Sequence, residues 1–396
     1  MSITLERTFH PVGHGAFFTE CFDSGNGHKF NVVYDCGTNS PKQVLDNAIN
    51  KALAKGTAIN VVFVSHLDKD HINGIKVLAA NKNLTNRTLF VMPLFSKEVY
   101  VLAYLRYGSS FIQMFRAISK VGCSVLFVDH IDNERDQQAD ASIDLHENRL
   151  EEKWETTSPV GGVPVKTATI QSGTRLKYLD IWEYVPFNPS GADAVLFQQE
   201  LRKQQIQLDL VLNALRKTRK SQAEKNELEK VKSIYKKVTT RVGKDSNKLN
   251  ISSLVLLSHK SNNVTGVESL PPCPCFYHPY CCWDDKKSAC LYTGDTDLST
   301  RSVYYQLMKD VMRYQGGEGL RYIQIPHHGS RNNYSDALCK DMRYNCAFTN
   351  YGINYHQNIF DSRLIMEYLK QGRPLALITE YPQTILKEIV FLNMVN

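Results

Sequence analysis

No stretch of this sequence is apolar over the ~20 residues that a helix needs to cross a bilayer. Its first residues, Met-Ser-Ile-Thr-Leu-Glu, lack the basic and then apolar pattern of an export signal. The net charge of +7 is modest for 396 residues, so the chain as a whole is neither strongly basic nor strongly acidic. We therefore expect a cytoplasmic protein with no membrane segment.

The ten cysteines do not change that expectation, because disulfides belong to oxidising compartments and no export signal is present. Reduced thiols or a metal site are expected instead. Residues 273–282 hold five zinc-type ligands but lack the paired spacing of common zinc modules. A reduced surface loop between two strands is the default interpretation. The alternative is a structural zinc site formed by Cys273, Cys275, His278, Cys281 and Cys282.

Apolar runs alternate with amphipathic segments along most of the chain, which predicts layered α/β packing. The length allows two domains or one large domain with insertions. Residues 129–172 are polar and irregular and predict a loop or a weak hairpin. Helices are expected at 41–55, 72–80, 99–120 and 362–371, and strands within 9–37 and at 61–64, 89–93, 124–128, 174–185, 247–257 and 375–379.

Residues 192–240 differ in character from the rest of the chain. Leucine, valine and isoleucine recur at helical spacing, which predicts a helical hairpin turning near Ser221. Between Arg202 and Lys237 there are eleven Lys/Arg and four Asp/Glu, a local charge of +7. The basic face could bind a polyanion, or the apolar stripe could dock a partner helix. The simpler interpretation is a solvated charged face on helices packed against their own domain.

The strongest chemical signal is a cluster of metal-ligand residue types at the end of an apolar run. Residues 61–64 read as a buried strand, and His66, Asp68, Asp70 and His71 follow it. The ligand cluster therefore begins at the carboxyl end of a sheet, where open α/β folds bind their ligands. An acidic helix N-terminus would explain the two aspartates through the helix dipole, but it does not explain the histidines.

Three later segments carry further candidates. Residues 291–295 end in Thr-Gly-Asp, and residues 323–330 form a short apolar run that ends in Pro-His-His-Gly-Ser. His356 follows an Asn-Tyr-Gly segment that begins at residue 350. It could donate a proton to a leaving group, bind a phosphate, or simply pack within a loop.

The motif at residues 66–71 resembles the His-x-His-x-Asp-His metal motif of the metallo-β-lactamase fold, with Asp68 in place of the second histidine. The Val-Gly-x-Gly, Asp-Cys-Gly, Asn-x-x-Ser, Thr-Gly-Asp and His-His-Gly-Ser segments resemble, in the same order, landmarks of its ComEC-type branch. The resemblance implies an α/β metallo-β-lactamase αββα sandwich, in which two mixed sheets are flanked by helices. Its halves would be 1–191 and 243–396, with a basic helical hairpin inserted at 192–242 and a Cys-rich loop at 271–290.

The same resemblance implies a site for two divalent metal ions, zinc or manganese. His66 and Asp68 would bind one ion, Asp295 would bridge, and Asp70, His71 and His328 would bind the other. No histidine lies within 247–257, where many members have a third ligand for the first ion, and this harder ligand set favours manganese. The implied catalytic residues are Asp70, His327 and His356, and the implied supporting residues are Asp35, Asn250 and Ser330. Which of His327 and His328 binds the metal stays open.

These features predict a metal-dependent phosphodiesterase or nuclease that uses a metal-activated hydroxide on nucleic acid. One alternative is a small phosphodiester or a cyclic nucleotide as substrate, because the motif variant also resembles phosphorylcholine-esterase relatives. Another is a metal-binding scaffold that docks a protein partner through 192–242. A DNA-uptake relative suggests a bacterial DNA-processing or defence setting.

Overall fold

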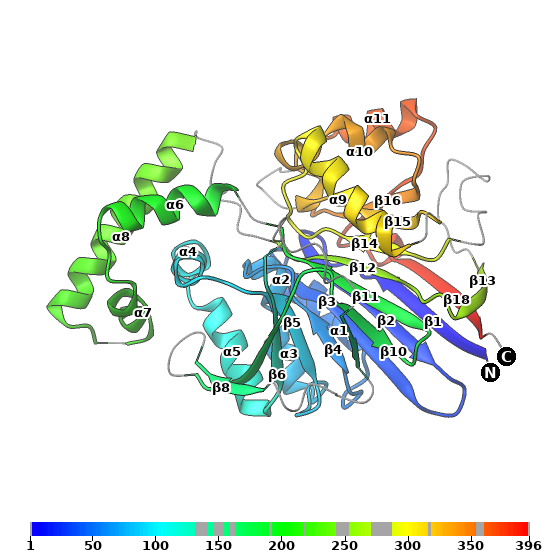
Figure 1. Cartoon of the computed structure of the whole chain (residues 1–396), viewed down its shortest axis with the longest axis horizontal. Helices are drawn as coiled ribbons and strands as arrows, with labels where there is room; N and C mark the ends of the chain where they lie inside the picture. The colour runs from blue at the N-terminus through cyan, green and yellow to red at the C-terminus, as the bar shows by residue number, and fades with distance from the viewer. Residues whose placement is uncertain are drawn as a thin grey trace.

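The chain forms two mixed β-sheets that face each other, with helices on both outer sides (Figure 1). This computed structural model describes residues 2–130, 141–145, 154–158, 163–189, 192–217, 219–242, 253–270, 287–315, 318–353 and 360–394. No helix among those residues is long and apolar enough to cross a membrane.

The first sheet has ten strands and is antiparallel at one end and mostly parallel at the other. Strands β3, β4, β5 and β6 are parallel to one another, so their carboxyl ends lie at the same edge of the sheet. In spatial order the strands are β13 (Val264–Leu270), β18 (Leu386–Met394), β1 (Ser2–Phe9), β2 (Gly15–Asp23), β3 (Lys29–Thr38), β4 (Val61–Phe63), β5 (Leu89–Pro93), β6 (Ser124–Val128), β9 (Val165–Ile170) and β8 (Glu155–Thr157).

The second sheet has eight strands and is also mixed. Its parallel strands β14, β15 and β16 end at the same side of the molecule as the candidate residues of the first sheet. In spatial order the strands are β17 (Leu375–Ile378), β16 (Tyr344–Asn350), β15 (Leu320–Gln324), β14 (Cys290–Tyr292), β12 (Val255–Lys260), β11 (Trp182–Phe187), β10 (Arg175–Tyr178) and β7 (Ser142–Asp144).

Three apolar cores hold these layers together. One lies between the sheets and is rich in aromatic side chains, and the other two lie between each sheet and its helices. The first sheet is covered by α1 (Lys42–Ala52), α2 (Lys69–Ile72), α3 (Ile75–Ala80), α4 (Lys97–Tyr107) and α5 (Ser110–Val121), and the second by α9 (Arg301–Tyr314), α10 (Asp336–Lys340) and α11 (Arg363–Lys370). The predicted two-sheet sandwich is confirmed.

A network of buried charges lies within the layer between the sheets. The guanidinium of Arg7 donates to Glu20 at 2.7 Å and to Glu388 at 2.8 Å, and all three side chains are buried. Arg321 lies 3.4 Å from the second oxygen of Glu388. Because β1 and β18 carry these residues side by side, the network ties the two ends of the chain together (Figure 1).

The segment at 192–242 contains three helices rather than the two of a hairpin: α6 (Ala192–Lys203), α7 (Leu208–Arg216) and α8 (Gln222–Val242). The turn near Ser221 is found between α7 and α8. The apolar stripe of these helices is buried in the core shared with α4, so it is covered by the chain itself. Several lysines pair with neighbouring glutamates, including Lys217 with Glu224 at 2.6 Å and Lys232 with Glu229 at 2.7 Å.

Four other expectations differ from the structure. The helix expected at 99–120 is broken at Gly108, whose φ of +65° lies in the left-handed region and ends α4. The strand expected at 174–185 is the hairpin β10–β11, with Leu179 and Asp180 at positive φ in its turn. The irregular segment at 129–172 includes β9, whose residues 166–170 pair with β6. The strand expected at 375–379 is found as β17, but it is not the last one, because β18 follows it and pairs with β1 at the other end of the chain.

Candidate metal centre

The carboxylate of Asp295 lies among three histidines just beyond the end of β14. Its Oδ2 atom is 3.4 Å from His66 Nε2, and its Oδ1 atom is 3.4 Å from His71 Nε2. His327 Nε2 approaches Oδ2 at 3.6 Å. Each oxygen of this carboxylate therefore faces a different histidine of the motif that follows β4.

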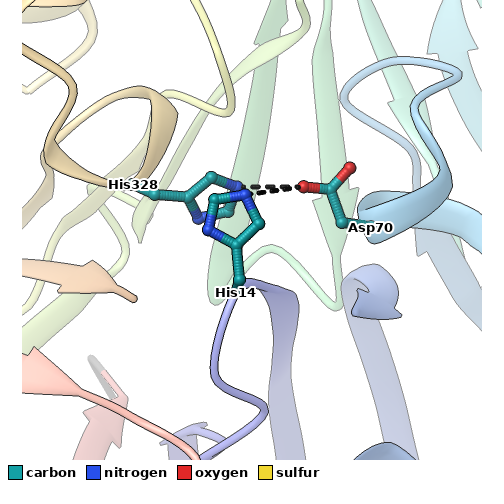
Figure 2. A group of neighbouring side chains, drawn as sticks. All are labelled: His14, Asp70 and His328. Carbon is teal, nitrogen blue, oxygen red and sulfur yellow. Dashed lines mark ion pairs between the residues drawn. The ribbon is translucent and has the colours of Figure 1, made fainter. Parts of the chain in front are cut away.

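A second group lies around Asp70, which is carried by α2. Asp70 Oδ2 is 3.3 Å from His328 Nε2 and 3.6 Å from His14 Nε2, and the two rings are 4.2 Å apart. Figure 2 shows the two imidazoles side by side, both directed at the carboxylate. These side chains come from the turn between β1 and β2, from α2, and from the end of β15, so only the folded chain brings them together.

The two groups adjoin each other. The rings of His66 and His71 are 4.1 Å apart, and those of His71 and His328 are 5.6 Å apart. His71 therefore lies between the carboxylates of Asp295 and Asp70. Within each group the potential ligand atoms lie within 4.8 Å of one another.

Hydrogen bonds from the surrounding chain orient these histidines. Asp35 accepts from the Ser65 amide at 2.7 Å, from the Ser65 hydroxyl at 2.7 Å and from His71 Nδ1 at 2.8 Å. Because the Ser65 hydroxyl donates its hydrogen to Asp35, it accepts one from His66 Nδ1 at 2.9 Å. His328 Nδ1 donates to the carbonyl of Asn350 at 3.0 Å. In all three rings the Nδ1 side is fixed, and Nε2 faces the carboxylates.

Replacing Asp35 with Asn should therefore weaken metal binding without removing a ligand. The neutral amide would keep the shape of the side chain but would hold His71 less firmly in the tautomer that presents Nε2. We expect the affinity for a divalent metal to fall about 10- to 100-fold, measured by calorimetric titration of metal-free protein. Asp180→Asn, in the exposed turn between β10 and β11, is the matched control. Equal affinity in Asp35→Asn and the control would contradict this role.

The backbone is also unusual at this place. Asp35, His327 and His328 have φ values of +53°, +49° and +54°, a conformation that costs non-glycine residues about 1–3 kcal/mol each. A Cβ atom on Gly37 would lie 2.5 Å from the carbonyl carbon of Asp70, so β3 and α2 can approach this closely only with glycine there. The fold therefore accepts local strain and close packing to bring the cluster together.

The charges of the cluster stabilise one another. Burial alone would raise the pKa of Asp295, but His327, His66 and His71 hold it well below its usual value. Burial and His71 act to lower the pKa of His66, yet Asp68 and Asp295 outweigh them and raise it to about 9. The raised pKa values of His66 and His71 thus place protons opposite the carboxylate of Asp295. A bound cation would take over that role and displace those protons.

The cluster fits divalent metal ions. The Nε2 atoms of His66, His71 and His328, together with Oδ1 of Asp295, are buried and make no hydrogen bond to any residue that the structure describes. Buried polar atoms are rarely left this way, because each lost hydrogen bond costs about 1–3 kcal/mol. Imidazole nitrogen and carboxylate oxygen are ligands for zinc and for manganese.

Most of the residues expected at the site are found there, but their grouping differs from the expected one. His71 lies with His66 and Asp295, and His14 joins Asp70 and His328. Asp68 is 3.5 Å from His66 Nε2 and also contacts an arginine. The role of Asp68 as a ligand stays a prediction.

Of the other residues that the sequence analysis assigned to the site, some lie in the described part of the chain and some do not. Ser330 is buried next to the histidine pair, and the Nδ1 atom of His327 is 2.8 Å from Asn333 Oδ1. His14 was missed by sequence reasoning, although its position between two glycines in the Val-Gly-x-Gly turn was a signal. The predicted residues that lie outside the described ranges are Asn250, Cys273, Cys275, His278, Cys281, Cys282 and His356.

No family model matches the sequence, and no curated protein matches it. Among solved structures, 11 chains match. The metallo-β-lactamase fold protein YhfI from Bacillus subtilis is 9% identical with a TM-score of 0.39, over 97% of this chain and 99% of that one. A long form RNase Z from yeast is 10% identical with a TM-score of 0.30, over 82% of this chain and 32% of that one. The metallo-β-lactamase SMB-1 is 10% identical with a TM-score of 0.29, over 82% and 80%.

Identities and TM-scores this low carry no argument about activity. The fold class rests on the chain's own two mixed sheets, on the helices that flank them, and on a candidate metal centre where strands of both sheets end. The chain therefore has an αββα arrangement, in which two mixed sheets lie between two layers of helices.

Proposed function

We propose that this protein is a metal-dependent hydrolase that cleaves phosphodiester bonds, with nucleic acid as its substrate. The observation that carries the proposal is the buried cluster in which the Nε2 atoms of His66, His71 and His328, none of them hydrogen-bonded to a described residue, face Asp295 and Asp70. Divalent ions bound there would supply hydroxide from water at neutral pH and stabilise charge on the phosphoryl oxygens.

The protein's own side chains would hold and orient this chemistry. Asp295 faces both motif histidines, and Asp35 fixes the ring of His71 from behind. His327 is fixed on its Nδ1 side by Asn333, so its Nε2 atom is directed at Asp295. Burial of the whole group excludes bulk water and so strengthens these electrostatic interactions.

Two features favour a phosphodiester as the substrate. The cluster holds three buried aspartates, Asp68, Asp70 and Asp295, and such oxygen ligands favour harder ions such as manganese. The resemblance of residues 326–330 to the ComEC-type signature supports the same substrate class. The lysine-rich exposed face of α8 suits a polyanion, so nucleic acid is preferred to a small ester.

The test is an assay of purified protein with manganese or zinc against single-stranded DNA, RNA and bis(p-nitrophenyl) phosphate. Reversing two exposed charges of α8, Lys225→Glu with Lys236→Glu, should raise the KM for nucleic acid about tenfold. The KM for the small ester should not change. The matched control is Lys309→Glu with Lys370→Glu, on α9 and α11 away from the insertion (Figure 1).

Two results would contradict the proposal and favour another function. Activity on the small ester alone, unchanged by the α8 reversals, would identify a small-phosphodiester or cyclic-nucleotide hydrolase. A protein that holds fewer than two metal ions and keeps its biological effect in Asp70→Ala would be a scaffold rather than an enzyme.

A further inference from the structure

The helices α1, α2, α3 and α5, which cover the first sheet, line a pocket with a volume of about 290 Å³ (Figure 1). A single water molecule needs only about 10–15 Å³ of such space, so the pocket has room for a larger ligand. Its volume is close to the lower end of the range of about 300–1,000 Å³ that is usual for small-molecule sites. None of the residues that line it belongs to the two histidine and aspartate groups of the metal centre.

The short helix α2 lies between this pocket and the metal centre. Asp70 and His71 of α2 belong to the metal centre. Lys69, Ile72 and Asn73, which precede and follow them, line the pocket. Residues three and four positions apart share one side of a helix, so Lys69 and Asn73 lie on the side of α2 that faces away from the metal centre. Because a helix with its side chains is about 10–12 Å across, the pocket lies about one helix diameter from the metal centre.

Hydrogen bonds hold the wall of the pocket in place. The side-chain amide of Asn73 donates to the carbonyl of Thr38 at 2.7 Å, and its Oδ1 atom accepts from the Thr38 amide at 3.1 Å. The hydroxyl of Ser40, which also lines the pocket, accepts from the backbone amide of His14 at 3.0 Å. The wall is thus tied both to α2 and to the turn that carries His14, so the pocket is formed before a ligand binds.

The charge of the pocket lining is positive. Lys42, Lys69 and Lys76 line it together with one carboxylate, Asp46. Lys42 pairs with Asp46, so these two charges compensate each other. Lys69 and Lys76 are exposed and form no ion pair with any residue that the structure describes. Two ammonium groups are therefore available to an anion, and phosphate is an anion that lysine commonly binds in proteins.

The free carboxylate oxygen of the pocket favours a nucleotide over a bare phosphate. The Oδ1 atom of Asp46 is buried and makes no hydrogen bond to a described residue. It would repel a second phosphate oxygen, but it can accept a hydrogen bond from an amino, imino or hydroxyl group. A nucleotide carries both kinds of group, because its phosphate is anionic and its base or sugar has N–H or O–H donors.

We propose that this pocket binds one nucleotide of the nucleic-acid substrate, with its backbone phosphate contacting Lys69 and Lys76 and a donor group of its base or sugar contacting Asp46. The inference rests on the proposed nuclease activity and names a substrate contact outside the metal centre. A stacked strand rises ~3.4 Å per nucleotide, so one helix diameter corresponds to about three nucleotides between the pocket and the cleaved bond.

The experiment measures binding of a short phosphorothioate oligothymidine, which resists hydrolysis, to the metal-loaded protein by fluorescence anisotropy. We expect Lys69→Gln with Lys76→Gln to raise the Kd about tenfold at low salt. The slope of log Kd against log salt concentration should fall by about 0.7 for each lysine removed, because each phosphate contact releases counterions from the strand. Lys76→Arg keeps the charge and should keep the slope.

Lys51→Gln with Lys120→Gln is the matched control. These exposed lysines lie on α1 and α5 but do not line the pocket, so their replacement removes the same charge from two of the same helices. The control should keep the slope, the metal content by elemental analysis and the rate on bis(p-nitrophenyl) phosphate. Equal slopes in the control and in Lys69→Gln with Lys76→Gln would overturn the inference.

Two further results would also overturn it. If Lys69→Gln with Lys76→Gln lost metal as well as oligonucleotide binding, the lysines would act through the metal centre. If binding of inorganic phosphate depended on the lysines and binding of the oligonucleotide did not, the occupant would be a free anion. If the oligonucleotide binds in a lysine-dependent way but the protein hydrolyses no phosphodiester, the proposed function fails while the pocket remains a nucleotide-binding site.

Discussion

Replacing Asp295 with Asn is expected to abolish hydrolysis and to release metal from the protein. The amide keeps the shape of the side chain but removes the charge that faces His66 and His71 through separate oxygens. Metal-based stabilisation of a phosphoryl transition state is worth several kcal/mol, so the rate should fall about 10³-fold or more. Metal content by elemental analysis and the rate on bis(p-nitrophenyl) phosphate are measured on the same preparation.

Asp297→Asn provides a control only two residues away. Asp297 is exposed and accepts a hydrogen bond from the amide of Ser299, so its replacement should leave both metal content and rate unchanged. If the Asp295→Asn protein kept its metal and most of its activity, Asp295 would be needed neither for metal binding nor for hydrolysis.

The second large effect is expected on stability. Arg7 is fully buried and compensates both Glu20 and Glu388, and the backbone carbonyl of Ser288 also accepts from it at 2.9 Å. Arg7→Met would leave two carboxylates in the layer between the sheets without their main partner. Breaking one side of a buried ion pair costs about 3–5 kcal/mol, and we expect at least this loss in the free energy of unfolding by urea.

Glu6→Gln, on the same strand, is the matched control for Arg7→Met. Glu6 pairs with Lys387 at 2.6 Å, but both side chains are more than two-fifths exposed, so the loss should be below about 1 kcal/mol. If the two variants unfolded at the same urea concentration, the buried network would not be a determinant of stability.

The parts of the fold that could be predicted from sequence are those set by local pattern. The strands β4, β5 and β6 are apolar runs, and their bounds were found within a residue. The motif after β4 could be assigned to a metal centre because carboxyl ends of parallel strands meet at one edge. The glycine at 108 was a local signal for a break that the expectation of one long helix over 99–120 did not use.

Contacts that only the folded chain creates could not be predicted in this way. His14 lies in a turn more than 300 residues before His328, and only the packing of the two sheets against each other brings the two rings together. The contact between Arg106 and Asp68, at 3.5 Å, has no signal in the sequence. It depends on how α4 packs between the insertion and the motif. The pairing of β18 with β1 is likewise set by the closure of the sheet.

Whether the candidate metal centre binds two metal ions is tested most directly by a crystal structure of the metal-loaded protein with anomalous scattering measured at the manganese and zinc edges. Two anomalous peaks are expected, one among His66, His71 and Asp295 and one among His14, Asp70 and His328. A map with no peak in this cluster, from protein that hydrolyses phosphodiesters in the same buffer, would contradict this expectation.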